Sequence, residues 1–223
     1  MEYYLYISRS KLDMLFPQVP HKIKKKYSAE FGVNIGLLKT KAAAEFAEEQ
    51  SSADAHRVAI VADYIRKHED VARLDDAQEW VEDEIEVKHL VVRDNPKVFL
   101  LVGEKDGQIH LLGGSSRHLI GAVPPTDADS GYSFFPHLVK NLEDVFSAEN
   151  AKSAATEYFV FGKLDNDIAG LRPHEWADIV YWLNRQATGE PMVVRFLGRH
   201  LARGRSLYQL ECTVCSPLYV ALR

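Results

Sequence analysis

Hydrogen-bond donors are concentrated at one point in the middle of the sequence, directly after a predicted strand. The residues are Gly113, Gly114, Ser115, Ser116, Arg117 and His118. Paired glycines readily adopt positive φ angles, so a turn here would expose successive backbone N–H groups as an anion-binding concavity. Hydroxyl, guanidinium and imidazole groups all donate to phosphate oxygens. We expect a site for a small anion; the alternative is a tight turn whose polar side chains face water.

A second cationic group is predicted on a helix that begins near Pro191 and ends at Gly204. Arg195, Arg199 and Arg203 recur every four residues, which places them on one side of a helix. Such a row of guanidinium groups binds phosphate-rich ligands or acidic protein surfaces. We therefore add Arg195 and Arg199 to the expected ligand-binding residues, the alternative being a solvated face opposite an apolar stripe.

We expect no metal, no cofactor and no assigned catalytic residue. Asp165 and Asp167 could bind a metal after a predicted strand, but the neighbouring Asn166 and glycines favour a surface turn. Cys212 and Cys215 have no second cysteine pair with which to form a zinc site. They lie in an apolar strand-like stretch and, three positions apart, face opposite sides of a strand, so we expect two buried thiols. Gly-x-Ser-x-Gly and His-Glu-x-x-His motifs are absent, as are the phosphate-loop and dinucleotide fingerprints.

The charge distribution argues against a general nucleic-acid-binding protein. The formal net charge is −5, whereas proteins of that class are usually basic. The acidic segment 75–86 has no basic residue, and the lysines of segment 22–26 lack the interleaved aromatics typical of nucleic-acid binding. The acidic segment could dock a protein partner.

The elements that must position these residues alternate between helices and strands. Strands are expected at 3–8, 33–38, 85–92, 98–102, 109–112, 158–161, 208–214 and 218–222. Helices are expected at 11–16, 20–31, 42–50, 54–68, 136–147, from Pro173 onward and at 191–204. Asp106-Gly107 is a hairpin signal between two of the strands. The pattern predicts a mixed α/β (α+β) fold with a central, partly antiparallel sheet and flanking helices.

Composition indicates an ordinary globular chain. The 223 residues are 46% hydrophobic and 26% charged, and we expect one domain over residues 1–223. No apolar run approaches the roughly 18 residues that span a bilayer, and the N-terminal stretch reads as a strand rather than a signal peptide. With only two cysteines, a reducing cytoplasm is the expected location.

Three segments resemble an uncharacterised family of bacterial proteins, described only as a domain of unknown function. They are Tyr4–Ser8 with Lys11–Leu15, Gly113–Ser115 with His118–Gly121, and Ser216–Ala221. Because they lie at the start, middle and end of the chain, the resemblance spans nearly all of it. It supplies no site residues, and it implies a sensor role in bacterial signalling or defence, since relatives occur beside modules of that kind.

The sequence therefore leads to three functional hypotheses. The first is a non-enzymatic sensor or regulatory module that binds a small anionic, nucleotide-like ligand through the Gly113–His118 segment. The second is a protein-interaction module that uses the acidic segment 75–86 or the arginine row. The third is an enzyme acting on a phosphate-containing substrate, with His118 as acid or base.

Overall fold

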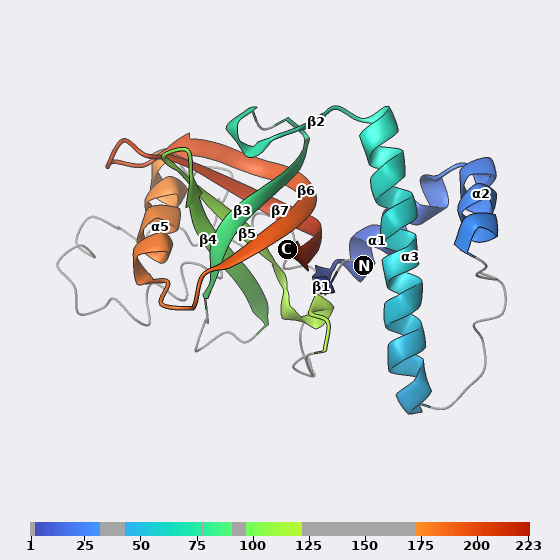
Figure 1. Cartoon of the computed structure of the whole chain (residues 1–223). Coiled ribbons are helices and arrows are strands. Elements are labelled where there is room, and N and C mark those ends of the chain that lie inside the picture. The colour runs from blue at the N-terminus through green and yellow to red at the C-terminus, as the bar shows by residue number, and fades with distance from the viewer. Residues whose placement is uncertain (1–2, 32–42, 77, 91–96, 122–172) are drawn as a thin grey trace, which may run out of the picture.

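The computed structural model describes residues 3–31, 43–76, 78–90, 97–121 and 173–223 of the chain (Figure 1). Five of the described strands close into a barrel. They are β3 (Trp80–Leu90), β4 (Val98–Lys105), β5 (Gln108–Ser115), β6 (Met192–Arg205) and β7 (Glu211–Leu222). The pairing runs β3-β4-β5-β7-β6 and back to β3, and only β5 and β7 are parallel. The predicted α+β class with a mixed, partly antiparallel sheet is confirmed, while closure of the sheet was not foreseen.

Two short strands extend the barrel. β1 (Tyr3–Ile7) pairs antiparallel with the last residues of β7. β5 pairs with the first residues of β7, on the same edge of that strand. β2 (Val71–Ala72) pairs parallel with the beginning of β3. The N-terminal strand and the C-terminal strand are therefore neighbours, as Figure 1 shows.

The expected hairpin at Asp106-Gly107 is confirmed. Asp106 and Gly107 have φ angles of 53° and 73°, and they join β4 to β5. Positive φ at both central residues defines the two-residue turn whose twist matches that of the flanking strands. β3, β4 and β5 thus form the predicted antiparallel meander.

Alternation along the strands divides the apolar side chains between the inside and the outside of the barrel. On β4, Phe99 and Leu101 belong to one buried cluster, while Val98, Leu100 and Val102 belong to another. The first cluster fills the barrel; its other members include Tyr6, Val81, Ile85, Leu112, Val194, Phe196, Cys215 and Val220. Strands buried on both faces explain why β4 reads as a continuous apolar run.

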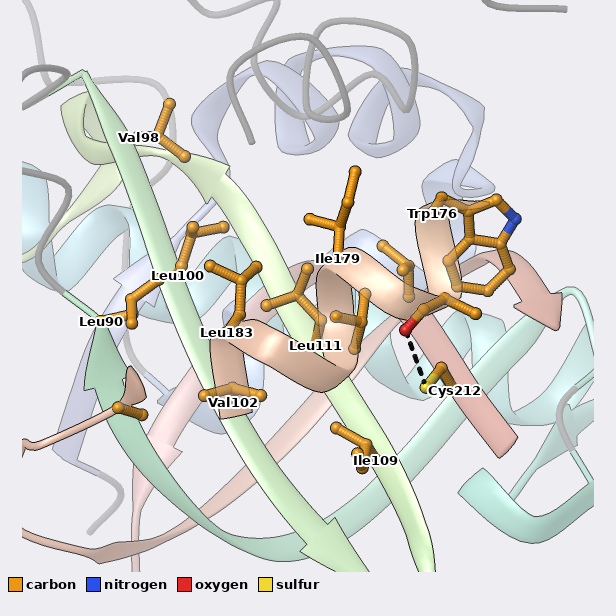
Figure 2. Close-up of a cluster of buried hydrophobic side chains, with 14 residues drawn as sticks. Leu90, Val98, Leu100, Val102, Ile109, Leu111, Trp176, Ile179, Leu183 and Cys212 are labelled. Atoms are coloured by element: carbon orange, nitrogen blue, oxygen red, sulfur yellow. Dashed lines mark hydrogen bonds between the residues drawn. The ribbon is translucent and has the colours of Figure 1, made fainter. Parts of the chain in front are cut away.

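Helices cover two regions of the outer face. α5 (Pro173–Gln186) packs Trp176, Ile179 and Leu183 onto β4, β5 and β7 (Figure 2). α1 (Arg9–Leu15) and α3 (Ala43–His68) pack elsewhere on the barrel, over β1 and β7 (Figure 1). α2 (His21–Phe31) contacts α3, and single 3₁₀ turns occur at Phe16–Gln18, Leu74–Asp76 and Ser116–His118.

Four predictions of local structure differ from the structure. The helix expected at 191–204 is strand β6, which is hydrogen-bonded to β3 and β7 on either side. The expected turn at Gly113-Gly114 is the last part of β5. Segments 42–50 and 54–68 form one helix, and the two C-terminal strands form one strand, β7. The strands expected at 33–38 and 158–161 and the helix expected at 136–147 lie outside the described residues.

Candidate functional site

A groove of about 810 Å³ lies between helices α1 and α3 and the outer face of the barrel. Pockets that hold small organic ligands have volumes of roughly 300–1,000 Å³. Its lining includes Lys11, Tyr64, Ile65, Trp80, Arg199 and Ser216. These residues come from segments far apart in the sequence, 11–80 and 199–216, so the groove depends on long-range contacts between them.

One row of residues across three strands forms the floor of the groove. Arg199 of β6 is in register with Trp80 of β3 on one side and with Ser216 of β7 on the other. Side chains in such a row point to the same face of a sheet. The row therefore places an aromatic ring, a guanidinium group and a hydroxyl side by side beneath α1.

A β-bulge turns Ser216 toward this face. Leu197 of β6 is opposite Tyr219 of β7, but the next residue, Gly198, is opposite Pro217. Leu218 is therefore an extra residue in β7. Leu218 and Tyr219 consequently both pack in the cluster beneath α1 and α3. If side chains alternated strictly from Tyr219, Ser216 would point into the barrel. The bulge reverses the direction of the Ser216 side chain, and bulges beside functional sites often redirect side chains in this way.

Lys11 of α1 reaches down onto this floor. Its Nζ donates to Ser216 Oγ at 2.6 Å and to the Pro217 carbonyl oxygen at 3.1 Å. Burial and the nearby Arg199 guanidinium lower the pKa of Lys11 to about 7. Within the described part of the chain, no carboxylate forms an ion pair with Lys11. Lys11 thus has two neutral acceptors and, among the residues that the structure describes, no counter-ion.

Arg199 has a different environment from Lys11. Its Nη2 lies 2.5 Å from Glu79 Oε1, and the two side chains are 47% and 61% exposed. Exposed ion pairs of this kind contribute little free energy because water screens them. The Arg199 guanidinium can therefore exchange Glu79 for a bound anion at small cost.

His118 lies next to the groove and contacts Ser10, one of its lining residues. It is buried, packs edge-on against Tyr6, and has its Nε2 3.2 Å from the Ser10 Oγ that lines the groove. Burial, followed by the positive charges of Lys11, Arg9 and Arg117, lowers the pKa of His118 to about 4. The imidazole is therefore neutral near pH 7, and it orients Ser10.

The rest of the predicted donor segment is arranged differently from the expectation. Gly113, Gly114, Ser115 and Ser116 are buried, Ser115 accepts a hydrogen bond from the Arg117 backbone N–H, and the Arg117 side chain is exposed. The glycines have no positive φ and form no anion-binding turn. A ligand contact by these residues stays a prediction, although the turn on which it depended is absent.

The arginine row and the acidic segment neutralise one another, because β3 and β6 are antiparallel neighbours. Arg195 donates to Glu82 at 2.8 Å, and Arg66 of α3 donates to the same carboxylate at 2.6 Å. Burial opposes ionisation of Glu82, but Arg66 and Arg195 outweigh it and lower its pKa. Glu82 thus joins Arg66 of α3 to the barrel and also pairs with Arg195, while Arg203 pairs with Glu211 of β7.

Lys11 and Ser216 were not among the ligand-binding residues predicted from the sequence. Lys11 is one lysine in a short amphipathic helix, and Ser216 is one hydroxyl in an apolar strand. They are 205 positions apart, and no local pattern predicts that they meet. Of the predicted ligand-binding residues, only Arg199 lines the groove, with His118 directly behind it.

The described residues contain neither a cluster of side chains typical of a metal site nor a membrane-spanning helix. In this part of the chain, no group of three or more His, Cys, Asp or Glu side chains is arranged to hold a metal ion. The described helices include none with the length and apolar character needed to cross a bilayer. Cys212 and Cys215 are buried free thiols in the outer and inner clusters respectively, as expected from their spacing.

Comparison with known proteins places the chain in a family. Residues 2–223 match the family described as "Family of unknown function (DUF7019)". No curated protein and no solved structure matches the chain. Since the match covers nearly every residue, including those that form the groove, the chain belongs to this family of unknown function.

Proposed function

We propose that this protein is a sensor or regulatory module that binds a small, partly apolar anion in the groove between α1, α3 and the barrel. The observation that carries the proposal is the position of Lys11. Its amine is held on the groove floor by Ser216 and Pro217 without a described carboxylate partner. Burial favours the neutral form of this amine, and an anion bound beside Lys11 would favour the charged form, for which the described residues supply no opposite charge.

The chemistry of the groove supports an anion with an apolar part. Lys11 and Arg199 form its cationic end, and Ser216 between them adds a hydroxyl. Tyr64 and Ile65 of α3 and Trp80 of β3 form an apolar wall. Aromatic side chains stack on planar ligands, so aromatic carboxylates and nucleotides both match this lining.

The protein-interaction hypothesis is less well supported by the charges of the described residues. The acidic segment and the arginine row were expected to be separate docking surfaces, but several of their charges pair with one another across β3 and β6. Paired charges attract a partner weakly. The small-anion hypothesis depends on Lys11, for which the described residues supply no carboxylate partner.

Thermal unfolding with defined probes tests the proposal. The probes are 4-methylbenzoate, AMP and cyclic AMP, with 4-methylbenzamide as an uncharged match for the carboxylate. A probe at about 100 times its dissociation constant stabilises the folded chain by about 2.7 kcal/mol. For a chain of this length, that corresponds to a rise of roughly 5–10 °C in Tm. We expect this rise with at least one anion and none with the amide.

Three variants locate the site. Lys11→Met keeps the length of the side chain and should abolish the rise, while Arg199→Ala should weaken binding by about tenfold. Arg117→Ala is the matched control, because Arg117 is an exposed arginine outside the groove lining. Loss of binding in Arg117→Ala but not in Lys11→Met would indicate that the anion binds at the Gly113–His118 segment and not in the groove. No response of the unmodified protein to any anion would refute the function.

A further inference from the structure

The Lys11 amine has the environment of a reactive lysine. A lysine amine attacks carbonyl carbon only when it is unprotonated, and burial or a second nearby cation favours that form. Lys11 has both features, since it lies on the groove floor beside Arg199. With a pKa of about 7, the neutral amine is roughly a thousandfold more abundant near pH 7 than in an ordinary lysine.

Lys11, rather than Ser216, is the group placed to meet a ligand. The Ser216 side chain is completely buried, and its Oγ lies beneath the Lys11 Nζ at 2.6 Å. Lys11 is half-buried whereas Ser216 is fully buried, so a ligand entering the groove meets the lysine side chain first. Lys11 and Ser216 lie as close together as the residues of a serine–lysine dyad. In such a dyad the serine oxygen is the nucleophile, whereas here we assign that role to the lysine nitrogen.

We propose that Lys11 forms a covalent imine with the carbonyl group of an anionic aldehyde or ketone bound in the groove. This inference rests on the proposed function, because the anionic group of the ligand is bound by Arg199. The proposed substrate class of the site is a small molecule with a carboxylate or phosphate group and a reactive carbonyl. Tyr64 and Trp80 would contact the apolar part of this molecule.

The reaction balances without a further reactant. The Nζ lone pair of neutral Lys11 attacks the carbonyl carbon, and a proton moves from nitrogen to the carbonyl oxygen to give a carbinolamine. The carbon–oxygen bond then breaks, the oxygen leaves as water with a second proton, and a carbon–nitrogen double bond remains. No oxidation or reduction occurs. Ser216, within hydrogen-bonding distance of Nζ, orients the attacking amine.

Reductive trapping tests the imine directly. The folded protein is mixed with 4-carboxybenzaldehyde near pH 7, treated with sodium cyanoborohydride, digested and mapped by mass spectrometry. Lys22 and Lys25, exposed on α2, are internal reference lysines in the same sample. We expect at least about tenfold more reduced adduct on Lys11 than on either reference. Neutral benzaldehyde should label Lys11 much less, because it has no anionic group for Arg199.

Two variants separate failure of the imine from failure of anion binding. Lys11→Arg keeps a cation on the groove floor, so it should still respond to 4-methylbenzoate in thermal unfolding but should form no adduct at position 11. Ser216→Ala removes the orienting hydroxyl and should lower the rate of adduct formation on Lys11 without abolishing it.

The outcomes are distinct. If 4-methylbenzoate stabilises the protein but Lys11 is labelled no more than Lys22 and Lys25, the imine is refuted and the anion site stands. If benzaldehyde labels Lys11 as strongly as 4-carboxybenzaldehyde, an anionic substrate class is refuted. If neither stabilisation nor selective labelling occurs, both proposals are refuted.

Discussion

The hydroxyl of Tyr6 occupies the space where a Cβ atom at Gly114 would lie. Tyr6 projects from β1 into the barrel and stacks on Phe99 at a centroid distance of 5.2 Å. Glycine is therefore required at position 114 so that this ring can pass close to the backbone of β5. Gly114, one of the two glycines that resemble a ligand-binding turn in the sequence, is therefore explained by packing.

Gly114→Ala should destabilise the fold by about 1–3 kcal/mol, because the added methyl group overpacks the barrel against Tyr6. Chemical denaturation of Gly114→Ala, Tyr6→Phe and the double variant measures the coupling between the two sites. Since Tyr6→Phe removes the nearest clashing atom, the double variant should lose less stability than the sum of the single changes. Strict additivity would contradict the assigned contact.

Lys11→Met should change how stability depends on pH. The pKa of Lys11 falls from an ordinary 10.5 in the unfolded chain to about 7 in the folded one, so between these values the unfolded state binds more protons. Stability due to this residue therefore rises as the pH is raised through that window, by at most about 1.4 kcal/mol per pH unit. Denaturation curves at several pH values should show this rise in the unmodified protein and its absence in Lys11→Met.

The matched control for that experiment is Lys22→Met on the exposed face of α2. It should retain the pH dependence of the unmodified protein. The same dependence in all three proteins would mean that Lys11 keeps its ordinary protonation in the folded state.

Asp83→Asn should destabilise the barrel by about 2 kcal/mol or more. The carboxylate is 4% exposed and accepts from Lys105 Nζ at 2.6 Å and from the Glu84 backbone N–H at 2.8 Å. Removing its charge leaves the partly buried Lys105 without this counter-ion. Glu84→Gln is the control: it alters the neighbouring, exposed carboxylate that pairs with Arg223, and little change is expected.

The pH dependence of the Asp83 variant follows from the same contacts. Burial alone would raise the pKa of Asp83, but hydrogen bonds from Lys105, Leu74 and Glu84 outweigh it and lower the pKa. A lowered pKa gives stability that is present above the unfolded value of about 3.9 and is lost as the pH falls below it. The difference between the unmodified protein and Asp83→Asn should thus shrink in acid; a difference that grew would refute the assignment.

Neither cysteine should react with Ellman's reagent while the protein is folded. Burial raises the pKa of each thiol to about 12, and Cys212 also donates to the Ala177 carbonyl oxygen at 3.3 Å (Figure 2). The thiolate is the reactive species, so labelling must await unfolding. Both thiols should react in concentrated guanidinium chloride, and rapid labelling of either one in buffer alone would contradict this burial.

Local chemistry made much of the fold predictable. The Asp106-Gly107 turn, the alternation in β3 and the apolar stripe of α3 depend on neighbouring residues, and the sequence contains them. β6 was misread because it carries apolar side chains on both faces: Val194 lies inside the barrel and Leu197 lies outside it. A bulge at Leu201 then interrupts the alternation, so Val194, Leu197 and Leu201 have the spacing of a helix in the sequence.

The site was less predictable than the fold. Donor-rich residues such as Arg117 stand out in a sequence, yet the structure leaves the Arg117 side chain exposed. Lys11 acquires its lowered pKa from burial and from Arg199, and both depend on the pairing of β6 with β7 and on the packing of α1. Burial of one side chain by residues about 200 positions away has no local signature.

The most direct measurement is an NMR titration of the Lys11 Nζ, with and without saturating 4-methylbenzoate, using Lys11→Arg to assign the resonance. A Lys11 amine that titrates near pH 7 in the free protein, and at a higher pH once the carboxylate neutralises its surroundings, is the predicted result. An amine that titrates near the ordinary value of about 10.4 and does not respond to the carboxylate would contradict an anion site on the groove floor.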